Sequence, residues 1–431
     1  LGAGFELAEA HKLYVCLDKL LEHKSALFEH LNQRWRDLFN AKFDVLLYDL
    51  TSTYFESDPP FEGKRQFGYS RDKRPDCVQV VIALVVTPEG FPLGYEVMAG
   101  NTADNTTLRG MLKKIEDQYG RANRVWVMDR GIPTEEVLGE MRGAAPPVYY
   151  LVGTPKGRLS RYEQALASRP WKKVREDVSV KLLRDESEIY VYAQSEKRVK
   201  KERAMRKRRL RRLIAALEAL RGRKRLTRDV LLMKLGAAQK DAGRAYGLME
   251  ITVPAAGQSI DAGTFHWRIN RAKYRRAYRR EGRYLLRSNL PAGDPAKLWE
   301  YYIQLTEIEE AFRNLKGDLA FRPIYHKHES RIEAHIFISF LAYCLHVTLK
   351  QRCKAHAPGL TPRSVLEQLK AMQMIDVHIP TVDGRRLKMS RYTQPDKAQK
   401  LLLAQLQLAL PPQPPPEITA EQFDASCGED L

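Results

Sequence analysis

Two aspartates each follow a short apolar run, in positions where a carboxylate can bind a metal. Asp49 follows Val45–Tyr48, and Asp129 follows Arg124–Met128. Short apolar runs of this kind predict buried strands, and sheets flanked by helices place their polar sites at strand ends. Because Mg²⁺ is held by a few carboxylates together with waters and substrate phosphates, both aspartates are candidate metal ligands.

A third carboxylate should come from another element, and the helix expected over residues 298–316 offers Glu300, Glu307, Glu309 and Glu310. At about 100° per residue, with Tyr302 as zero, Glu309 falls at about −20° and Lys316 at about −40°, at the edge of the buried stripe. Glu310 falls at about +80°, facing away from the core. Only Glu309 shares its edge with an aromatic residue and a lysine, so it is the preferred ligand. Its neighbour Glu310 stays the main alternative.

The surrounding pattern predicts an α/β fold with a mixed sheet flanked by helices. In chain order the expected elements are a helix over 7–39, strands over 45–49, 78–86 and 91–98, a helix over 103–119, a strand over 124–128, a helix from Pro133 and a strand over 148–152. Later in the chain, residues 336–347 are apolar on nearly every side, which predicts a helix buried in the core.

Residues 154–290 interrupt this order with a basic α+β segment. Between Lys197 and Arg228 there are sixteen Lys or Arg residues and two Glu, while the leucines keep helical spacing. This predicts an amphipathic helix with a basic outer face. The outer-face cations are Lys207, Arg208, Arg211 and Arg212. Strand-like segments follow at 247–253, 265–269 and 284–287.

We therefore expect five segments along the chain. They are a helical N-terminal segment over 1–40, the first part of the core over 41–153, a basic insertion over 154–290, the second part of the core over 291–350, and a helical, proline-rich tail over 351–431.

Composition narrows the class of protein. The 431 residues include 72 Lys or Arg and 53 Asp or Glu, which gives a formal charge of +19. Such a surplus favours a polyanionic partner, and nucleic acid leads. The 44% hydrophobic content excludes a wholly disordered polycation. The five cysteines are scattered, no signal peptide is recognisable, and no apolar run approaches about 20 residues. We expect a cytoplasmic protein without membrane segments.

Several motifs resemble one protein family. The run Tyr302-x2-Leu305-x3-Glu309-x6-Lys316 resembles the Y-x2-R-x3-E-x6-K signature of bacterial insertion-sequence transposases of the DDE class. Similar blocks are YDLTSTYFE around Asp49, GYSRDKRPD near residue 70, GNTADNTTL near residue 105, VMDRGI around Asp129, and LAFRPIYHKHESRIEAHIFISFLAY after Glu309. The resemblance covers about residues 10–350.

The resemblance implies an RNase H-like, retroviral integrase-like core with a strand-rich insertion before the last acidic residue. Asp49, Asp129 and Glu309 would then bind two Mg²⁺ ions, or Mn²⁺, in each active site. The implied activity is cleavage at terminal inverted repeats, often through a hairpin, followed by strand transfer into target DNA. The implied partners are the DNA ends and a second copy of the chain in a synaptic complex associated with the nucleoid.

The same resemblance suggests DNA contacts. Tyr302 and Lys316 would hold terminal phosphates. The signature arginine is Leu305 here, and Arg313, at about +20° on the same wheel, is the replacement cation. Arg71, Arg74 and Arg130 are candidates to line the DNA channel. The four outer-face cations are candidates to contact backbone phosphates. Trp267 is the candidate for stacking on a displaced base, with Trp299 as its competitor.

Other functions stay open. A related RNase H-like nuclease could cut without strand transfer, and a catalytically inactive derivative could only bind DNA. A zinc site at His335, Cys344, His346, Cys353 and His356 is disfavoured because no C-x2-C pair exists. The sequence has no phosphate-cradling Gly-rich loop, so no nucleotide cofactor is expected. About 40 residues precede the core, and whether they belong to a truncated DNA-binding region stays open.

Overall fold

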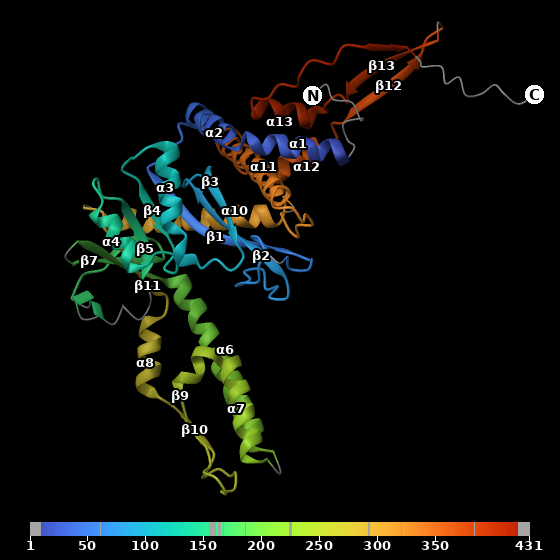
Figure 1. The fold of residues 1–431 in the computed structure, drawn as a ribbon. Coiled ribbons are helices and arrows are strands. Elements are labelled where there is room, and N and C mark those ends of the chain that lie inside the picture. The colour runs from blue at the N-terminus through green and yellow to red at the C-terminus, as the bar shows by residue number, and fades with distance from the viewer. Residues whose placement is uncertain are drawn as a thin grey trace, which may run out of the picture. The chain divides into compact units, whose positions relative to one another are not determined.

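The computed structural model of the chain describes residues 10–60, 62–154, 161–162, 165–166, 168–185, 187–223, 226–291, 294–319, 321–382 and 384–420 (Figure 1). Lys224 and Arg225 of the basic run lie outside these residues. By spatial contact the chain divides into two compact units, Leu1–Arg124 with Gln304–Leu431, and Val125–Ile303. The five segments expected from the sequence stay a prediction.

The first unit contains an antiparallel arrangement of three strands in the order β3-β2-β1. These are β1 (Val45–Phe55), β2 (Val78–Val86) and β3 (Pro92–Ala99). The helices of this unit are α1 (Ala10–Glu22), α2 (Lys24–Phe39), the 3₁₀ turn η2 (Asp104–Thr106), α3 (Leu108–Tyr119), α10 (Leu305–Lys316), α11 (Glu329–His356), α12 (Pro362–Leu369) and α13 (Lys397–Gln405). Helices α2 and α3 pack against β3, and α10 packs against β1 and β2.

Strand β1 is longer than the sequence pattern indicated. The prediction that it ends at Asp49 is wrong, because Asp49 lies opposite Leu84 in a ladder that continues to Phe55. The polar residues after Asp49 do not end the strand because they are buried, and Ser52 and Thr53 have hydrogen-bond partners. The Thr53 hydroxyl donates to the Phe321 carbonyl at 3.2 Å, and buried polar groups are tolerated when they are paired.

Helix α11 forms the core of the first unit, as its apolar sequence predicted. Phe340 stacks on Tyr95 of β3 with ring centroids 4.1 Å apart, and the Trp35 indole donates to Thr348 at 2.8 Å. By length and composition alone α11 would also suit a membrane span, but its buried residues pack against strands and helices of its own unit.

The C-terminal part of the first unit adds a small sheet that the sequence pattern did not predict. Its three antiparallel strands are β12 (Met374–Pro380), β13 (Arg385–Tyr392) and β14 (Glu417–Ala420). The proline-rich stretch between α13 and β14 is irregular, as proline requires.

The second unit carries six strands in the order β4-β5-β11-β8-β7-β6. They are β4 (Val125–Met128), β5 (Tyr149–Thr154), β6 (Lys172–Arg175), β7 (Val178–Asp185), β8 (Glu188–Ser195) and β11 (Arg283–Ser288). Strands β4 and β5 are parallel and the other pairs are antiparallel. Helix α4 (Glu135–Gly143) packs on β5. The expected mixed sheet flanked by helices is confirmed, with three antiparallel strands followed by helix, strand, helix and strand.

The basic insertion has a hydrophobic core of its own. Helices α6 (Glu196–Arg221) and α7 (Arg228–Ala242) pack side by side through leucines such as Leu217 and Leu231 (Figure 1). The 3₁₀ segment η3 (Gly243–Leu248), the hairpin β9 (Met249–Thr252) and β10 (His266–Ile269), and α8 (Arg271–Arg280) complete it. The predicted amphipathic helix is therefore confirmed, and it is capped by Ser195, whose hydroxyl accepts from the Arg198 amide.

The helix expected over residues 298–316 is two helices. Helix α9 (Pro295–Ile303) ends before Gln304, and α10 begins at Leu305. The prediction of one continuous helix is wrong, and the division between the two units falls at the same place. Tyr302 consequently belongs to the second unit and Glu309 to the first, so a single helical wheel does not relate them.

Candidate active site

Two of the three predicted carboxylates lie in the first unit. Asp49 is in the middle of β1, where its Oδ1 accepts from the Leu50 amide at 2.8 Å. Glu309 is on α10, the helix that packs against β1. A mid-strand position holds the Asp49 backbone in place through the ladder on its β2 side.

Glu309 and its alternative Glu310 have different surroundings. Lys350 of α11 donates to Glu310 at 3.0 Å and to Glu307 at 3.1 Å, so both of these carboxylates are held in a surface ion-pair cluster. Glu309 is exposed and has no hydrogen bond or ion pair to any residue that the structure describes. A carboxylate without a protein cation is the one available to a metal.

The third carboxylate, Asp129, directly follows β4 as predicted and belongs to the second unit. Its Oδ1 accepts from the Arg130 amide at 2.8 Å and from the Tyr302 hydroxyl at 3.4 Å. Burial, reinforced by the Asp129 charge, raises the pKa of Tyr302 far above its ordinary value, so the hydroxyl stays protonated and can donate. The signature tyrosine therefore positions an acidic residue as well as being a predicted phosphate contact.

Gly153 of β5 makes room for this pair. A Cβ atom at position 153 would lie 2.8 Å from the Tyr302 hydroxyl and 3.2 Å from Asp129 Oδ1. Because only glycine lacks this atom, the close approach of Tyr302 to Asp129 requires it. Sequence reasoning missed this residue.

Lys316 forms an ion pair with an acidic residue, Asp72, that the sequence pattern did not single out. Its ammonium lies 2.7 Å from Asp72, and Arg322 pairs with the same carboxylate. The Asp72 side chain is only 3% exposed. Burial lowers the pKa of Lys316, and the bond to Asp72 opposes this shift. Asp72 lies between Arg71 and Lys73 in GYSRDKRPD, and an acidic residue among cations was the signal that could have revealed it.

The predicted channel cations differ in their partners. Arg71 pairs with Asp104, while Arg74 pairs with Glu56 at 2.8 Å and with Asp76 at 2.9 Å. The bonds from Arg74 lower the pKa of Asp76 to about 2. Arg313 and Arg130 are exposed and have no side-chain ion pair with the described residues. All four stay predicted DNA contacts, and Arg71 and Arg74 would have to exchange a carboxylate for a phosphate.

The two motifs near residues 70 and 105 begin with glycines whose backbones touch. A Cβ atom on Gly68 would lie 2.0 Å from the Gly100 carbonyl oxygen, and one on Gly100 would lie 2.1 Å from that of Gln79. The Gln79 side chain joins the two segments by donating to the carbonyls of Tyr69 and Gly100. The segment that carries Arg71 and Asp72 is thus held against β2.

Gly100→Ala is expected to lower the free energy of unfolding by about 3 kcal/mol, because the added methyl group meets backbone atoms that cannot move aside. Urea denaturation measures the change. Gly110→Ala in α3 is the control, since nothing lies within 4 Å of its Cβ and alanine favours a helix. Equal stability of the Gly100→Ala variant and the wild type would contradict the assigned close packing.

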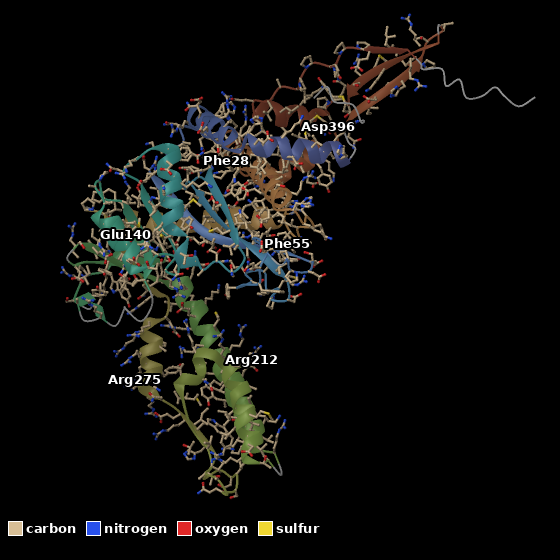
Figure 2. All side chains as sticks on the ribbon, viewed as in Figure 1. Phe28, Phe55, Glu140, Arg212, Arg275 and Asp396 are labelled. Carbon is tan, nitrogen blue, oxygen red and sulfur yellow. The ribbon has the colours of Figure 1, made fainter. Side chains whose placement is uncertain are left out.

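The outer face of α6 carries the predicted basic surface. Lys207, Arg208, Arg211 and Arg212 are all exposed, and none has an ion pair with a described residue. Arg212 is labelled in Figure 2. On the opposite side, Arg206 and Arg203 lie over the rings of Tyr274 and Tyr278 of α8, at 4.3 and 4.0 Å from the ring centroids. One side of the helix thus carries cations that pack on aromatic rings, and the other side carries cations that face solvent.

Replacing the four outer-face cations of α6 by Gln is expected to reduce the slope of log binding constant against log salt concentration by about 3.5, since each phosphate contact contributes about 0.9. DNA titrations at several salt concentrations measure it. The control replaces four exposed lysines in the C-terminal part of the chain: Lys354, Lys370, Lys397 and Lys400. An equal change in both variants would show that only net charge matters.

Trp267 is a partly buried member of the insertion core. It packs against Phe265 with ring centroids 5.4 Å apart, and the Arg221 guanidinium lies 4.7 Å from its ring centroid. Its competitor Trp299 is 3% exposed and donates to the Tyr284 hydroxyl. Stacking of Trp267 on a displaced base stays a prediction.

The three predicted carboxylates are of the type that suits a hard divalent cation, with Asp49 and Glu309 in the first unit and Asp129 in the second. Carboxylate oxygens are ligands that Mg²⁺ prefers. Asp129 keeps an oxygen that no described residue bonds, and Glu309 keeps both. Within either unit, the described residues hold no group of three or more His, Cys, Asp or Glu side chains that could bind a metal.

Acidic side chains on a mixed α/β core, combined with a basic helical insertion, are the make-up of a protein that processes nucleic acid. Residues 40–345 match the family described as "Transposase DDE domain". The match covers more than two thirds of the sequence, and the chain belongs to this family.

Comparison with individual proteins adds less. No curated protein matches the chain. The piggyBac transposase synaptic complex with hairpin DNA, solved by cryo-EM, is similar with a TM-score of 0.40 and 8% identity. The similarity covers 79% of this chain and 56% of that one, so the chain spans little more than half the length of that transposase.

Proposed function

We propose that this protein is a DNA transposase that cleaves the ends of a mobile element and joins them to target DNA. Membership of the transposase family supports the class of activity. The observation that carries the proposal is the lack of an ion pair, among the described residues, at two of the three predicted carboxylates. In a chain with a formal charge of +19, neither Asp129 nor Glu309 forms an ion pair with any described cation.

Asp49, Asp129 and Glu309 are proposed to hold two Mg²⁺ ions, or Mn²⁺ in their place. Metal bound there would lower the pKa of a water or a DNA 3′-hydroxyl and stabilise the leaving oxygen of an in-line displacement. The protein's own contribution is positioning. Tyr302 and the Arg130 amide fix one oxygen of Asp129 and thereby orient the other.

Lys316 is proposed to bind a terminal DNA phosphate as a point charge. In the free protein its ammonium is held by Asp72, so binding would replace a buried carboxylate by a phosphate. The outer face of α6 would contact the DNA backbone independently of sequence. A second copy of the chain is the proposed partner, because two element ends must be cut and joined together.

The test is an assay on DNA that carries an element end, with a target plasmid present. Cleaved ends and joined products are expected with MgCl₂, and neither is expected after chelation of the metal. Asp129→Asn is expected to abolish both products, which excludes a contaminating nuclease. No cleavage by the wild type would overturn the proposal. Cleavage without joined products would favour the alternative, an RNase H-like nuclease without strand transfer.

A further inference from the structure

A cavity of about 800 Å³ lies inside the basic insertion, away from the four exposed outer-face cations of α6. It is bounded by α6, the 3₁₀ segment η3 and α8. Its volume is in the range of cavities that hold small ligands. Seven of its fourteen lining residues are Lys or Arg and two are Glu, so positive charge predominates around this partly open cavity.

Part of this charge is compensated within the protein. Glu281 pairs with Arg206 and, at 3.2 Å, with Arg203, while Glu202 pairs with Arg198 at 3.1 Å. Glu202 also accepts from the Gly282 amide at 3.0 Å. The two carboxylates of the cavity are therefore already used by neighbouring groups.

Three cations of the lining remain without an acidic partner. Lys201, Arg209 and Arg244 have no ion pair with any residue that the structure describes. Lys201 and Arg244 are exposed and Arg209 is half-buried, and like charges around one cavity repel each other. A ligand with negative charge would relieve this repulsion.

Arg206 supplies an independent sign of a ligand. The residue lines the cavity, is 8% exposed and has a buried Nη1 with no hydrogen-bond partner among the described residues. A buried donor without a partner is costly unless a ligand or a water satisfies it. Its other guanidinium nitrogens are bonded to Glu281, so the free donor is held in a fixed place.

The rest of the wall is mostly apolar. Met205, Ala245, Leu248 and Ala277 complete the lining together with the polar Ser195. We propose that the cavity binds a 5′-phosphorylated nucleotide, with its phosphate on Lys201, Arg209, Arg244 and Arg206 Nη1 and its base against the apolar wall. The nucleotide could be free or could be the terminal nucleotide of a DNA strand.

The test needs neither metal nor cleavage, so its outcome is independent of the proposed function. Calorimetric titration of the full chain with dAMP is expected to show binding, and inorganic phosphate is expected to bind at least tenfold more weakly because it does not use the apolar wall. The double variant Arg209→Gln, Arg244→Gln is expected to lose at least tenfold in affinity for dAMP. The control Arg275→Gln, Arg276→Gln changes two exposed cations of α8 outside the cavity and should bind dAMP as the wild type does. Arg275 is labelled in Figure 2.

A second arm distinguishes the two sources. It compares DNA with a 5′-phosphorylated single-stranded end and the same DNA closed by a hairpin, each with the wild type and the Arg209→Gln, Arg244→Gln variant. Variant-sensitive binding of dAMP assigns a free nucleotide, and variant-sensitive preference for the open DNA end assigns a strand terminus. Absence of both, or equal loss in the control variant, would overturn the proposal.

Discussion

Glu309→Gln is expected to reduce the rate of DNA end cleavage by about a thousandfold, while leaving the fold intact. A carboxylate that holds a catalytic metal supports several kcal/mol of transition-state stabilisation, and each 1.36 kcal/mol corresponds to a factor of ten in rate. Glu309 is exposed on α10 and bonds no described residue, so its replacement removes no structural contact. Single-turnover cleavage with MgCl₂ measures the rate.

The matched control is Glu310→Gln, on the same helix and adjacent in sequence. Glu310 shares Lys350 with Glu307, so Lys350 keeps one partner, and partly exposed pairs of this kind contribute little. A change of only a few fold in cleavage is expected. If the two variants exchanged behaviour, Glu310 would be the third ligand and the helical wheel would have selected the wrong residue.

Glu281→Gln is expected to destabilise the basic insertion by about 3 kcal/mol. Glu281 is 7% exposed and bonds both Arg206 and Arg203. Removal of its charge leaves Arg206 buried without a counterion, and loss of one partner of a buried pair is strongly destabilising. Urea denaturation followed by tryptophan fluorescence, with Trp267 as a reporter inside the insertion core, measures the effect.

Glu250→Gln serves as the comparison within the same insertion. Glu250 pairs with Arg268 at the surface, where both side chains are well exposed, and its loss should leave the unfolding midpoint unchanged. Equal midpoints for Glu281→Gln and the wild type would mean that solvent in the adjacent cavity already screens Arg206.

Local patterns in the sequence were sufficient for much of the fold. The strand over 78–86 and the aspartate that follows β4 were predicted correctly, because burial on both sides of a strand leaves a continuous apolar run. The same rule failed at β1, where Thr51, Ser52 and Thr53 are polar yet buried. The hydrogen-bond partners of Ser52 and Thr53 are the Arg71 amide and the Phe321 carbonyl, and no local pattern contains residues so far away in the chain.

The candidate active site was predictable only in part. Asp49, Asp129 and Glu309 were chosen from strand ends, a helical wheel and a family signature, and their catalytic role stays a prediction. Lys316 and Asp72 lie 244 positions apart in the sequence, so their ion pair is a product of tertiary folding. The break at Gln304 was also missed, since the wheel assumes that a helix continues wherever its apolar spacing does.

The place of Asp49 within β1 limits how the lengths of related proteins can vary. Side chains alternate between the two faces of a strand, so an insertion or deletion of one residue between Asp49 and Phe55 would turn Asp49 to the opposite face. The stretch between Asp129 and Glu309 contains an insertion with its own hydrophobic core, where residues can be gained or lost without turning either carboxylate. Relatives of this protein should therefore keep the number of residues between Asp49 and Phe55 constant and differ freely in the number between Asp129 and Glu309.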